Sequence, residues 1–278
     1  MSVTLLNLCW NQLEVSKDTV RRALKEPEID EVIVVDNGST DGTKEYYRKL
    51  AGVVATSGKD GLEKLEFKTG NQKLIFIDWP VNAGASVARN LGISIAKGDY
   101  IFLIDGDILY VPGTVKEYQK ILEDYPDAAC VGQNSFEMVV QLGHNGTQNA
   151  IEADARMEEG YTISDWFPMA WTQYGLFRAE LLRQYPFIEE PPYNEPGYGY
   201  EDDDLYHQLR EVGYVSLAVD KPLYYHEAHG GIRELMKADL ELKLKERKKV
   251  FEKRWGKNSQ WSEWLNKHNP ERTTRPKP

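Results

Sequence analysis

The stretch Tyr100-Ile-Phe-Leu-Ile-Asp-Gly-Asp-Ile108 predicts a buried strand that ends abruptly in two carboxylates. The residues before Asp105 are apolar or aromatic on both faces, which is typical of a central strand in a parallel sheet. Such sheets bind ligands just past the carboxyl ends of their strands, where Asp105 and Asp107 lie. Two carboxylates so close together resist ionising unless a cation is near them. A divalent metal explains the pair, and a plain Asp-Gly turn is the alternative.

The chain before this strand alternates predicted strands and helices. Strands are predicted at residues 3–8, 31–35 and 73–77, and helices at residues 11–25, 40–50 and 82–96. Residues 51–71 predict an excursion or hairpin before the third strand. The alternation indicates an α/β fold, Rossmann-like, with a mostly parallel central sheet flanked by helices.

The chain after this strand is less regular. Helices are predicted from about Pro112 to residue 122, at residues 201–212 and at residues 233–255, and short strands at residues 128–131 and 214–218. An irregular region and an aromatic cluster lie between them. One globular unit with a carboxyl-terminal helical extension fits this pattern best.

The composition is that of an ordinary globular protein, with 41% hydrophobic and 28% charged residues among 278. The two cysteines, Cys9 and Cys130, argue against a disulfide framework and a structural zinc cluster. The first apolar run is too short for a signal peptide, and no later run approaches the ~20 residues of a membrane span. We therefore expect a cytoplasmic protein.

The charge is unevenly distributed. Residues 233–278 contain 14 Lys and Arg against 7 Asp and Glu, whereas the other 232 residues contain 20 against 37. The acidic part disfavours broad binding to a nucleic-acid backbone. The basic tail is explained by a solvated helix face with a frayed end, or by contact with an anionic partner.

Two stretches of the first half carry polar residues at predicted strand ends. Asp36 ends the second strand, where an acid can accept hydrogen bonds from a ribose or a base, although a simple capping turn explains the same residues. Asn82-Ala-Gly-Ala-Ser86 opens a helix whose free N–H groups would favour a phosphate, with Arg89 following. Close helix packing through alanine and glycine is the alternative there.

Two stretches of the second half add acids and histidines. Glu201-Asp-Asp-Asp204 opens a helix with more negative charge than the helix dipole needs, after a glycine-rich loop that could close on a ligand. At least one of these acids is expected to accept a proton. His226 or His229 could supply a metal with its nitrogen ligand, although a lone histidine is more often structural.

In this order, the stretches resemble the nucleotide-sugar glycosyltransferases of the GT-A fold, in particular the large inverting family two. Asp105-Gly-Asp107 is similar to the family's DxD motif and Glu201-Asp202 to its Glu-Asp motif, while residues 201–204 also resemble the acidic loop of galactosyltransferases. The resemblance implies a GT-A domain over residues 1–230, with a nucleotide-binding half at 1–110 and an acceptor-binding half at 111–230. Residues 231–278 would form a basic helical extension.

The resemblance also implies roles at the donor end of the site. A UDP-sugar would be bound by Leu8, Cys9, Trp10, Asn11 and Asp36 around the base, and by Asn82, Gly84, Arg89, Asp105 and Gly106 around the phosphates and sugar. Asp107 and His226 would hold Mn²⁺ or Mg²⁺ on the diphosphate. The metal would neutralise the charge that develops on the leaving group.

At the acceptor end, the resemblance makes Asp202 the general base for the acceptor hydroxyl, with Glu201 positioning the acceptor and Asp203 as the alternative base. Stacking on a sugar ring is possible for Trp166, Trp171 and Tyr198, beside Gly199, although such a cluster is more often core. The acceptor could be a glycan, a lipid-linked sugar, a protein or a modified nucleic-acid base. A GT-A-like nucleotidyltransferase and a catalytically inactive sugar-binding module are the alternative functions.

Overall fold

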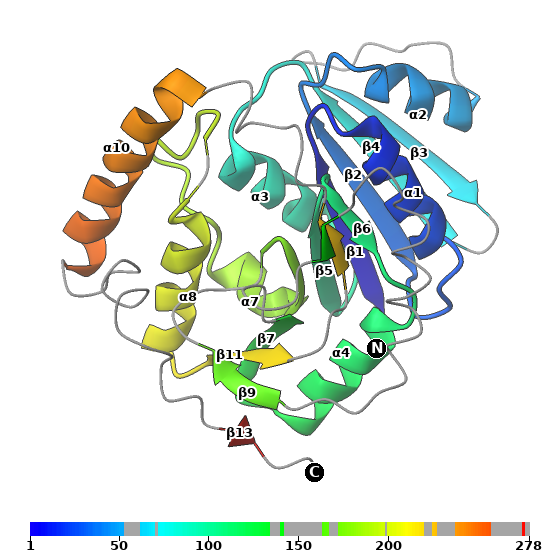
Figure 1. Cartoon of the computed structure of the whole chain (residues 1–278). Helices are drawn as coiled ribbons and strands as arrows, with labels where there is room; N and C mark the ends of the chain where they lie inside the picture. The colour runs from blue at the N-terminus through cyan, green and yellow to red at the C-terminus, as the bar shows by residue number, and fades with distance from the viewer. Residues whose placement is uncertain are drawn as a thin grey trace.

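The computed structural model describes residues 1–52, 62–69, 72–133, 140–141, 163–166, 172–197, 199–219, 224–226, 237–256 and 274–275. Figure 1 shows a central sheet of strands with helices packed around it. The arrangement is a mixed α/β fold, in agreement with the fold class that the sequence predicts.

The first half of the sheet is parallel. Its strands, in the order β5-β1-β2-β4, are β5 (Tyr100–Asp105), β1 (Val3–Cys9), β2 (Glu31–Asn37) and β4 (Gln72–Trp79). They are joined through α1 (Leu13–Ala23), α2 (Thr43–Ala51) and α3 (Ala85–Ile95). The predicted excursion is a hairpin, because β3 (Glu63–Thr69) pairs antiparallel with β4.

The register of these strands brings their carboxyl ends to one edge of the sheet. Leu8 of β1 lies opposite Asp105 of β5, and Cys9 lies opposite Asp36 of β2. The loops that follow the three strands therefore begin side by side, although they are far apart in the sequence.

The second half of the sheet is mixed rather than parallel. Strand β10 (Tyr174–Arg178) lies antiparallel between β5 and β7 (Ala128–Gln133), and β11 (Val215–Val219) runs parallel to β7. β9 (Ile163–Trp166) and β13 (Thr274–Arg275) continue the sheet at its edge. β10 lies within the predicted aromatic cluster, where no strand was predicted. By pairing with β5, it satisfies the backbone hydrogen-bonding groups on that edge of β5.

A smaller sheet lies beside the large one, in the order β6-β12-β8. It consists of β6 (Ile108–Tyr110), β12 (Tyr224–His226) and β8 (Val140–Gln141). Its first strand starts directly after Asp107, so it connects the paired acids to residues more than a hundred positions later.

Two apolar layers form the core, one on each face of the large sheet. Alternate residues of β2 divide between them: Val32 and Val34 face the layer under α1, α2 and α4 (Thr114–Asp124), whereas Ile33 and Val35 face the other layer. This second layer is covered by α3, α7 (Ala179–Gln184) and α8 (Glu201–Glu211). Burial on both faces explains why the strands are apolar almost throughout.

The predicted carboxyl-terminal helix is present as α10 (Lys237–Trp255), which lies alongside α8 (Figure 1). The ring of His207 on α8 stacks on Trp255, with ring centroids 5.1 Å apart. Among the described residues, no helix combines the length and apolar character that crossing a bilayer requires. The domain boundary at residue 230 stays a prediction.

Candidate active site

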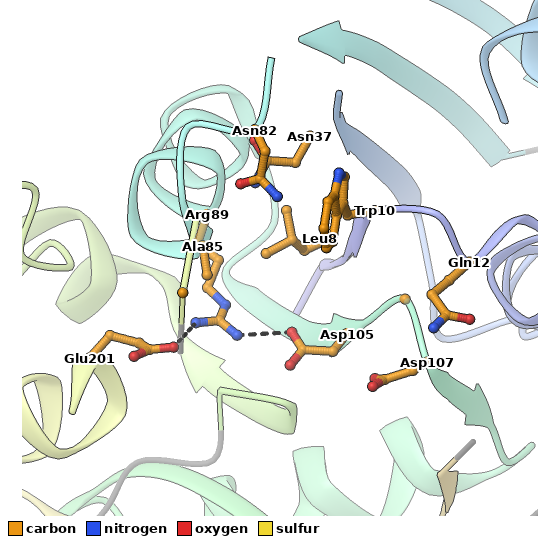
Figure 2. A pocket seen from close by; sticks show the side chains of 12 residues that line it. Leu8, Trp10, Gln12, Asn37, Asn82, Ala85, Arg89, Asp105, Asp107 and Glu201 are labelled. Carbon is orange, nitrogen blue, oxygen red and sulfur yellow. Dashed lines mark hydrogen bonds and ion pairs between the residues drawn. The ribbon is translucent and has the colours of Figure 1, made fainter. Parts of the chain in front are cut away.

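A pocket opens at the edge where β1, β2 and β5 end. Its wall is built from the loops after these strands, the start of α3 and the start of α8 (Figure 2). The lining residues are Leu8, Trp10, Gln12, Asn37, Asn82, Ala85, Arg89, Asp105, Gly106, Asp107, Gly197 and Glu201. Segments from both halves of the chain thus meet in one cavity.

The loop after β5 presents the two predicted acids. Gly106 is required between them, because a Cβ at this position would lie 2.9 Å from the carbonyl oxygen of Leu8. The turn therefore packs directly on the end of β1, and Asp105 and Asp107 both line the pocket. Burial raises the pKa of Asp105, and the charge of Asp107 adds to this rise, while Arg89 opposes it.

Arg89 joins the two acidic stretches of the site. Its side chain is only 4% exposed, and Nη2 donates a 2.9 Å hydrogen bond to Oδ1 of Asp105. On its other side, Nη1 lies 3.7 Å from Oε1 of Glu201 (Figure 2). Burial works against the positive charge, but the two carboxylates outweigh it and raise the pKa of Arg89. The guanidinium therefore stays charged between them.

The predicted phosphate-binding start of α3 is only partly open to the pocket. Asn82 and Ala85 line the cavity, whereas Gly84 is buried. Gly84 has φ +84°, and a Cβ there would lie 2.6 Å from the carbonyl oxygen of Tyr193. This glycine lets α3 pack against the segment at residues 190–197, so the packing explanation accounts for Gly84.

Asp204, the last acid of the run at the start of α8, has structural partners. The side chain is 1% exposed and accepts hydrogen bonds from Trp255 Nε1 at 2.7 Å and from Gln208 Nε2 at 2.9 Å. Arg254 lies 3.4 Å away. Asp204 therefore connects α8 to α10 and does not line the pocket.

Asp202 and Asp203 differ in what surrounds them. Burial raises the pKa of Asp202 to about 7, Glu201 adds to the rise, and Arg89 opposes it. Burial also raises the pKa of Asp203, but its further causes are the charges of Asp202, Glu201 and Asp204. Neither acid lines the pocket, but the lining residues Arg89 and Asp105 act on the carboxyl of Asp202, whereas the charges that act on Asp203 are those of α8 itself.

Some residues of the loop after β1 line the pocket, and others hold the loop in place. Leu8 and Trp10 line the pocket. Cys9 is fully buried behind them, and burial raises the pKa of its thiol to about 12. Asn11 ties this loop to the next one, because its Oδ1 accepts a 2.7 Å hydrogen bond from the backbone N–H of Thr40.

The end of β2 presents Asn37, not Asp36, to the pocket. Asp36 is fully buried, and burial raises its pKa to about 6. Its Oδ1 accepts a 3.0 Å hydrogen bond from the N–H of Ser39, while Oδ2 has no partner among the described residues. Asn37 donates through Nδ2 to Oδ1 of Asn82 at 3.0 Å. Asp36 therefore holds the turn to Ser39, and its contact with a base stays a prediction.

Four lining residues were not predicted: Gln12, Asn37, Ala85 and Gly197. Successive side chains of a strand point to opposite faces, so Asn37 faces away from the side on which Asp36 is buried. This alternation could have predicted Asn37 as a lining residue. Ala85 belongs to the small-residue stretch that the sequence singles out. Gly197 begins the glycine-rich loop before Glu201, which the sequence singles out as a loop that could close on a ligand.

The acids of the pocket suit a hard divalent cation, because carboxylate oxygens are the ligands that Mg²⁺ and Mn²⁺ prefer. The side chains described here include no group of three or more His, Cys, Asp and Glu arranged to hold a metal. The backbone of His226 pairs with that of Ile108, the residue after Asp107. This register brings the predicted ligand pair together in the fold, although the His226 side chain is outside the described set.

The structure describes only some of the predicted acceptor residues. Gly199 lies in the loop before α8 with φ +99°. Trp166 belongs to β9, four strand positions from β5 in the sheet, or roughly 19 Å at the usual strand spacing. Trp171, Tyr198 and His229 fall outside the described residues.

The fold and this pocket define a glycosyltransferase domain of the GT-A type. The chain belongs to glycosyl transferase family 2, whose model matches residues 8–185. The match ends before α8 and α10, so the acids at 201–204 and the last long helix lie beyond it.

Known proteins agree with this assignment. The chain is 28% identical over 204 residues to the succinoglycan biosynthesis protein ExoA of Rhizobium meliloti (strain 1021), covering 71% of this chain and 54% of that protein. The curated relatives are longer: the matched part spans 13% to 54% of their length.

Two solved structures show the same fold. One is the mannosyltransferase PcManGT from Pyrobaculum calidifontis in complex with GDP-Man and Mn²⁺, with a TM-score of 0.59 at 18% identity over 89% of this chain and 64% of that one. The other is S. aureus TarS 1–349 in complex with UDP-GlcNAc, with a TM-score of 0.55 at 15% identity over 94% of this chain and 73% of that one.

Proposed function

We propose that this protein is a metal-dependent, inverting glycosyltransferase that moves a sugar from a nucleoside-diphosphate sugar, a UDP-sugar, to an acceptor hydroxyl. One observation carries the proposal: Asp105, Asp107 and Glu201 line a single pocket, and Arg89 lies between Asp105 and Glu201. The first half of residues 1–230 would bind the donor and the second half the acceptor.

The donor end is supported by the loops that begin at the sheet edge. Leu8, Trp10 and Asn37 line the pocket together with Asp105, and a base and a ribose would fit beside the first three. The structural relatives are named with GDP-Man and with UDP-GlcNAc, which are both nucleoside-diphosphate sugars. The preference for uridine rests on the family resemblance.

The metal would be held by Asp107 and His226, and Mn²⁺ or Mg²⁺ there would neutralise charge on the departing nucleoside diphosphate. Asp105 is engaged by Arg89 at 2.9 Å, which leaves it suited to contact the sugar or ribose. Two carboxylates or fewer, completed by substrate phosphates, are a usual way to hold Mg²⁺.

The proton chemistry is assigned to Asp202. The acceptor oxygen would attack the anomeric carbon, the bond from that carbon to the diphosphate oxygen would break, and the hydroxyl proton would pass to the Asp202 carboxylate. A pKa of about 7 suits this role, because the group is substantially ionised near neutral pH and still basic enough to accept a proton. A single displacement inverts the anomeric configuration.

The alternative functions fit the site less well. A nucleotidyltransferase attacks phosphorus and has no need of a base near the sugar carbon, whereas Asp202 has its pKa raised beside the pocket. An inactive binding module has no use for buried, mutually repelling acids, which cost stability.

The test is a panel of nucleotide sugars with Mn²⁺, read by thermal shift and by slow hydrolysis of the donor. A tight donor at about 100 times its dissociation constant stabilises the fold by about 2.7 kcal/mol. We expect Asp107→Ala to weaken Mn²⁺-dependent UDP binding roughly tenfold or more. Unchanged UDP affinity would refute the metal role of Asp107, and neither binding nor hydrolysis across the panel would refute the function.

A further inference from the structure

Arg247 on α10 is the largest fully buried side chain of the described chain, with 1% exposure. A charged residue in such a place needs compensating partners. The basic helix reads in the sequence as a solvated face, and it lies beyond the family match at residues 8–185. Burial of Arg247 therefore calls for a separate explanation.

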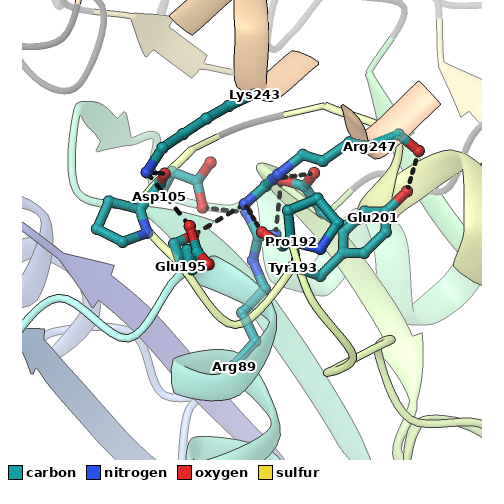
Figure 3. Close-up of polar contacts among 9 residues, drawn as sticks. Arg89, Asp105, Pro192, Tyr193, Glu195, Glu201, Lys243 and Arg247 are labelled. Atoms are coloured by element: carbon teal, nitrogen blue, oxygen red, sulfur yellow. Dashed lines mark hydrogen bonds and ion pairs between the residues drawn. The ribbon is translucent and has the colours of Figure 1, made fainter. Parts of the chain in front are cut away.

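The guanidinium is held from three sides (Figure 3). Nη2 donates to the carbonyl oxygens of Glu195 at 2.9 Å and of Pro192 at 3.3 Å, and the group lies over the ring of Tyr193. Nη1 donates to Oε2 of Glu201 at 3.3 Å. Arg247 thus clamps the segment at residues 190–197 and the first residue of α8 at once.

These contacts lie directly behind the wall of the pocket. Gly197 lines the cavity, and a Cβ added to it would be 3.0 Å from Nη2 of Arg247. Glu201 also lines the cavity. Arg247 therefore reaches the site from behind without being part of its lining.

The charges form an alternating series. Arg247 contacts Glu201, Glu201 lies 3.7 Å from Arg89, and Arg89 donates to Asp105. Removing one member of a buried series leaves its partner uncompensated. Without Arg247, Arg89 would be the cation left beside Glu201 among the described residues and would be drawn from Asp105.

We propose that Arg247 is a positioning residue for sugar transfer, which fixes Glu201 at the pocket wall and, through Arg89, the orientation of Asp105. This inference rests on the proposed function of the same pocket. Arg247 itself is not among the residues that line the pocket. We expect the effect of replacing Arg247 to depend on the charge of Glu201, which distinguishes positioning from a purely structural role.

The variants are Arg247→Met and Arg247→Lys, each alone and combined with Glu201→Gln. Arg254→Met is the matched control, because Arg254 also joins α10 to an acid of α8, Asp204, but away from the pocket. Urea unfolding of all variants measures the energetic coupling between Arg247 and Glu201 and does not require enzymatic activity. We expect Arg247→Met to destabilise the fold less when Glu201→Gln is already present.

Steady-state hydrolysis of the best UDP-sugar with Mn²⁺ reports the functional role. We expect Arg247→Met to lower kcat roughly 10- to 100-fold in the folded fraction, and less than about twofold in the Glu201→Gln background. Arg247→Lys should recover part of the rate, because it restores the charge without the paired geometry. Arg254→Met should keep the wild-type rate.

Three outcomes are decisive. Equal rate losses from Arg247→Met with and without Glu201→Gln would overturn the inference and leave the proposed function standing. If Arg247→Met does not fold, Arg247→Lys gives the same comparison, and full activity of that variant in both backgrounds would also overturn it. A wild-type protein that neither binds nor hydrolyses any donor fails the proposed function, and the inference falls with it, whatever the unfolding data show.

Discussion

The two acidic stretches of the pocket differ in how the fold manages their charge. In the loop after β5, a glycine separates two acids, and one arginine compensates Asp105 while Asp107 lines the cavity. At the start of α8, four consecutive acids each have different surroundings. Acids within one motif thus differ in burial and neighbours, and these differences are what can give residues of one type separate roles.

The largest expected effect separates Asp202 from Asp203. We expect Asp202→Asn to lower donor hydrolysis about 10²- to 10⁴-fold, the usual contribution of a general base, while UDP affinity is kept. Asp203→Asn should have a much smaller effect, because Asp203 interacts with its own helix. Steady-state kinetics and UDP titration measure both quantities. A larger rate loss in Asp203→Asn would reverse the assignment of the two acids.

The next effect concerns the pH dependence of stability. Asp36 and Asp202 have folded-state pKa values of about 6 and about 7, above the ~4 of an unfolded aspartate. The folded state therefore binds more protons between these values, and the free energy of unfolding should fall as pH rises from ~4 to ~7. Urea unfolding across this range tests it.

Asn variants at Asp36 and Asp202 serve as the internal comparison for this pH effect. Each should flatten the decline in its own window, which ends near pH 6 for Asp36 and near pH 7 for Asp202. A decline that keeps its full slope in both variants would assign it to other acids.

The smallest effect belongs to the structural end of the run. Trp255→Phe removes the N–H that donates to Asp204 at 2.7 Å, so we expect a loss of about 1 kcal/mol in unfolding free energy and no change in donor hydrolysis. Lys249→Ala, an exposed change on the same helix, is the control and should be neutral. A loss of hydrolysis in Trp255→Phe would show that Asp204 acts in the site.

Local sequence patterns predict the parts of the molecule whose structure depends on residues close together in the sequence. The apolar run at residues 100–104 gave β5 its place in the core, and strand alternation with helices gave the parallel half of the sheet. The acids at 105, 107 and 201 all line the pocket, as their positions at strand and helix ends indicate.

The parts that escaped prediction depend on long-range pairing. β10 was hidden because its partners β5 and β7 lie 40 or more residues before it in the sequence, and its five residues do not specify a neighbour. Arg247 was hidden because its contact with Glu201 spans 46 residues. Asp36 was predicted as a site residue because it is charged, whereas Asn37 beside it is the residue that lines the pocket.

The placement of β10 has a consequence for how the chain is synthesised. Its five residues occupy the side of β5 away from β1, and they follow β5 by about 70 positions. Until the ribosome has delivered them, the nascent first half carries an unpaired, strongly apolar strand edge of the kind that promotes association between chains. The strand order therefore requires that this edge of β5 be protected during translation.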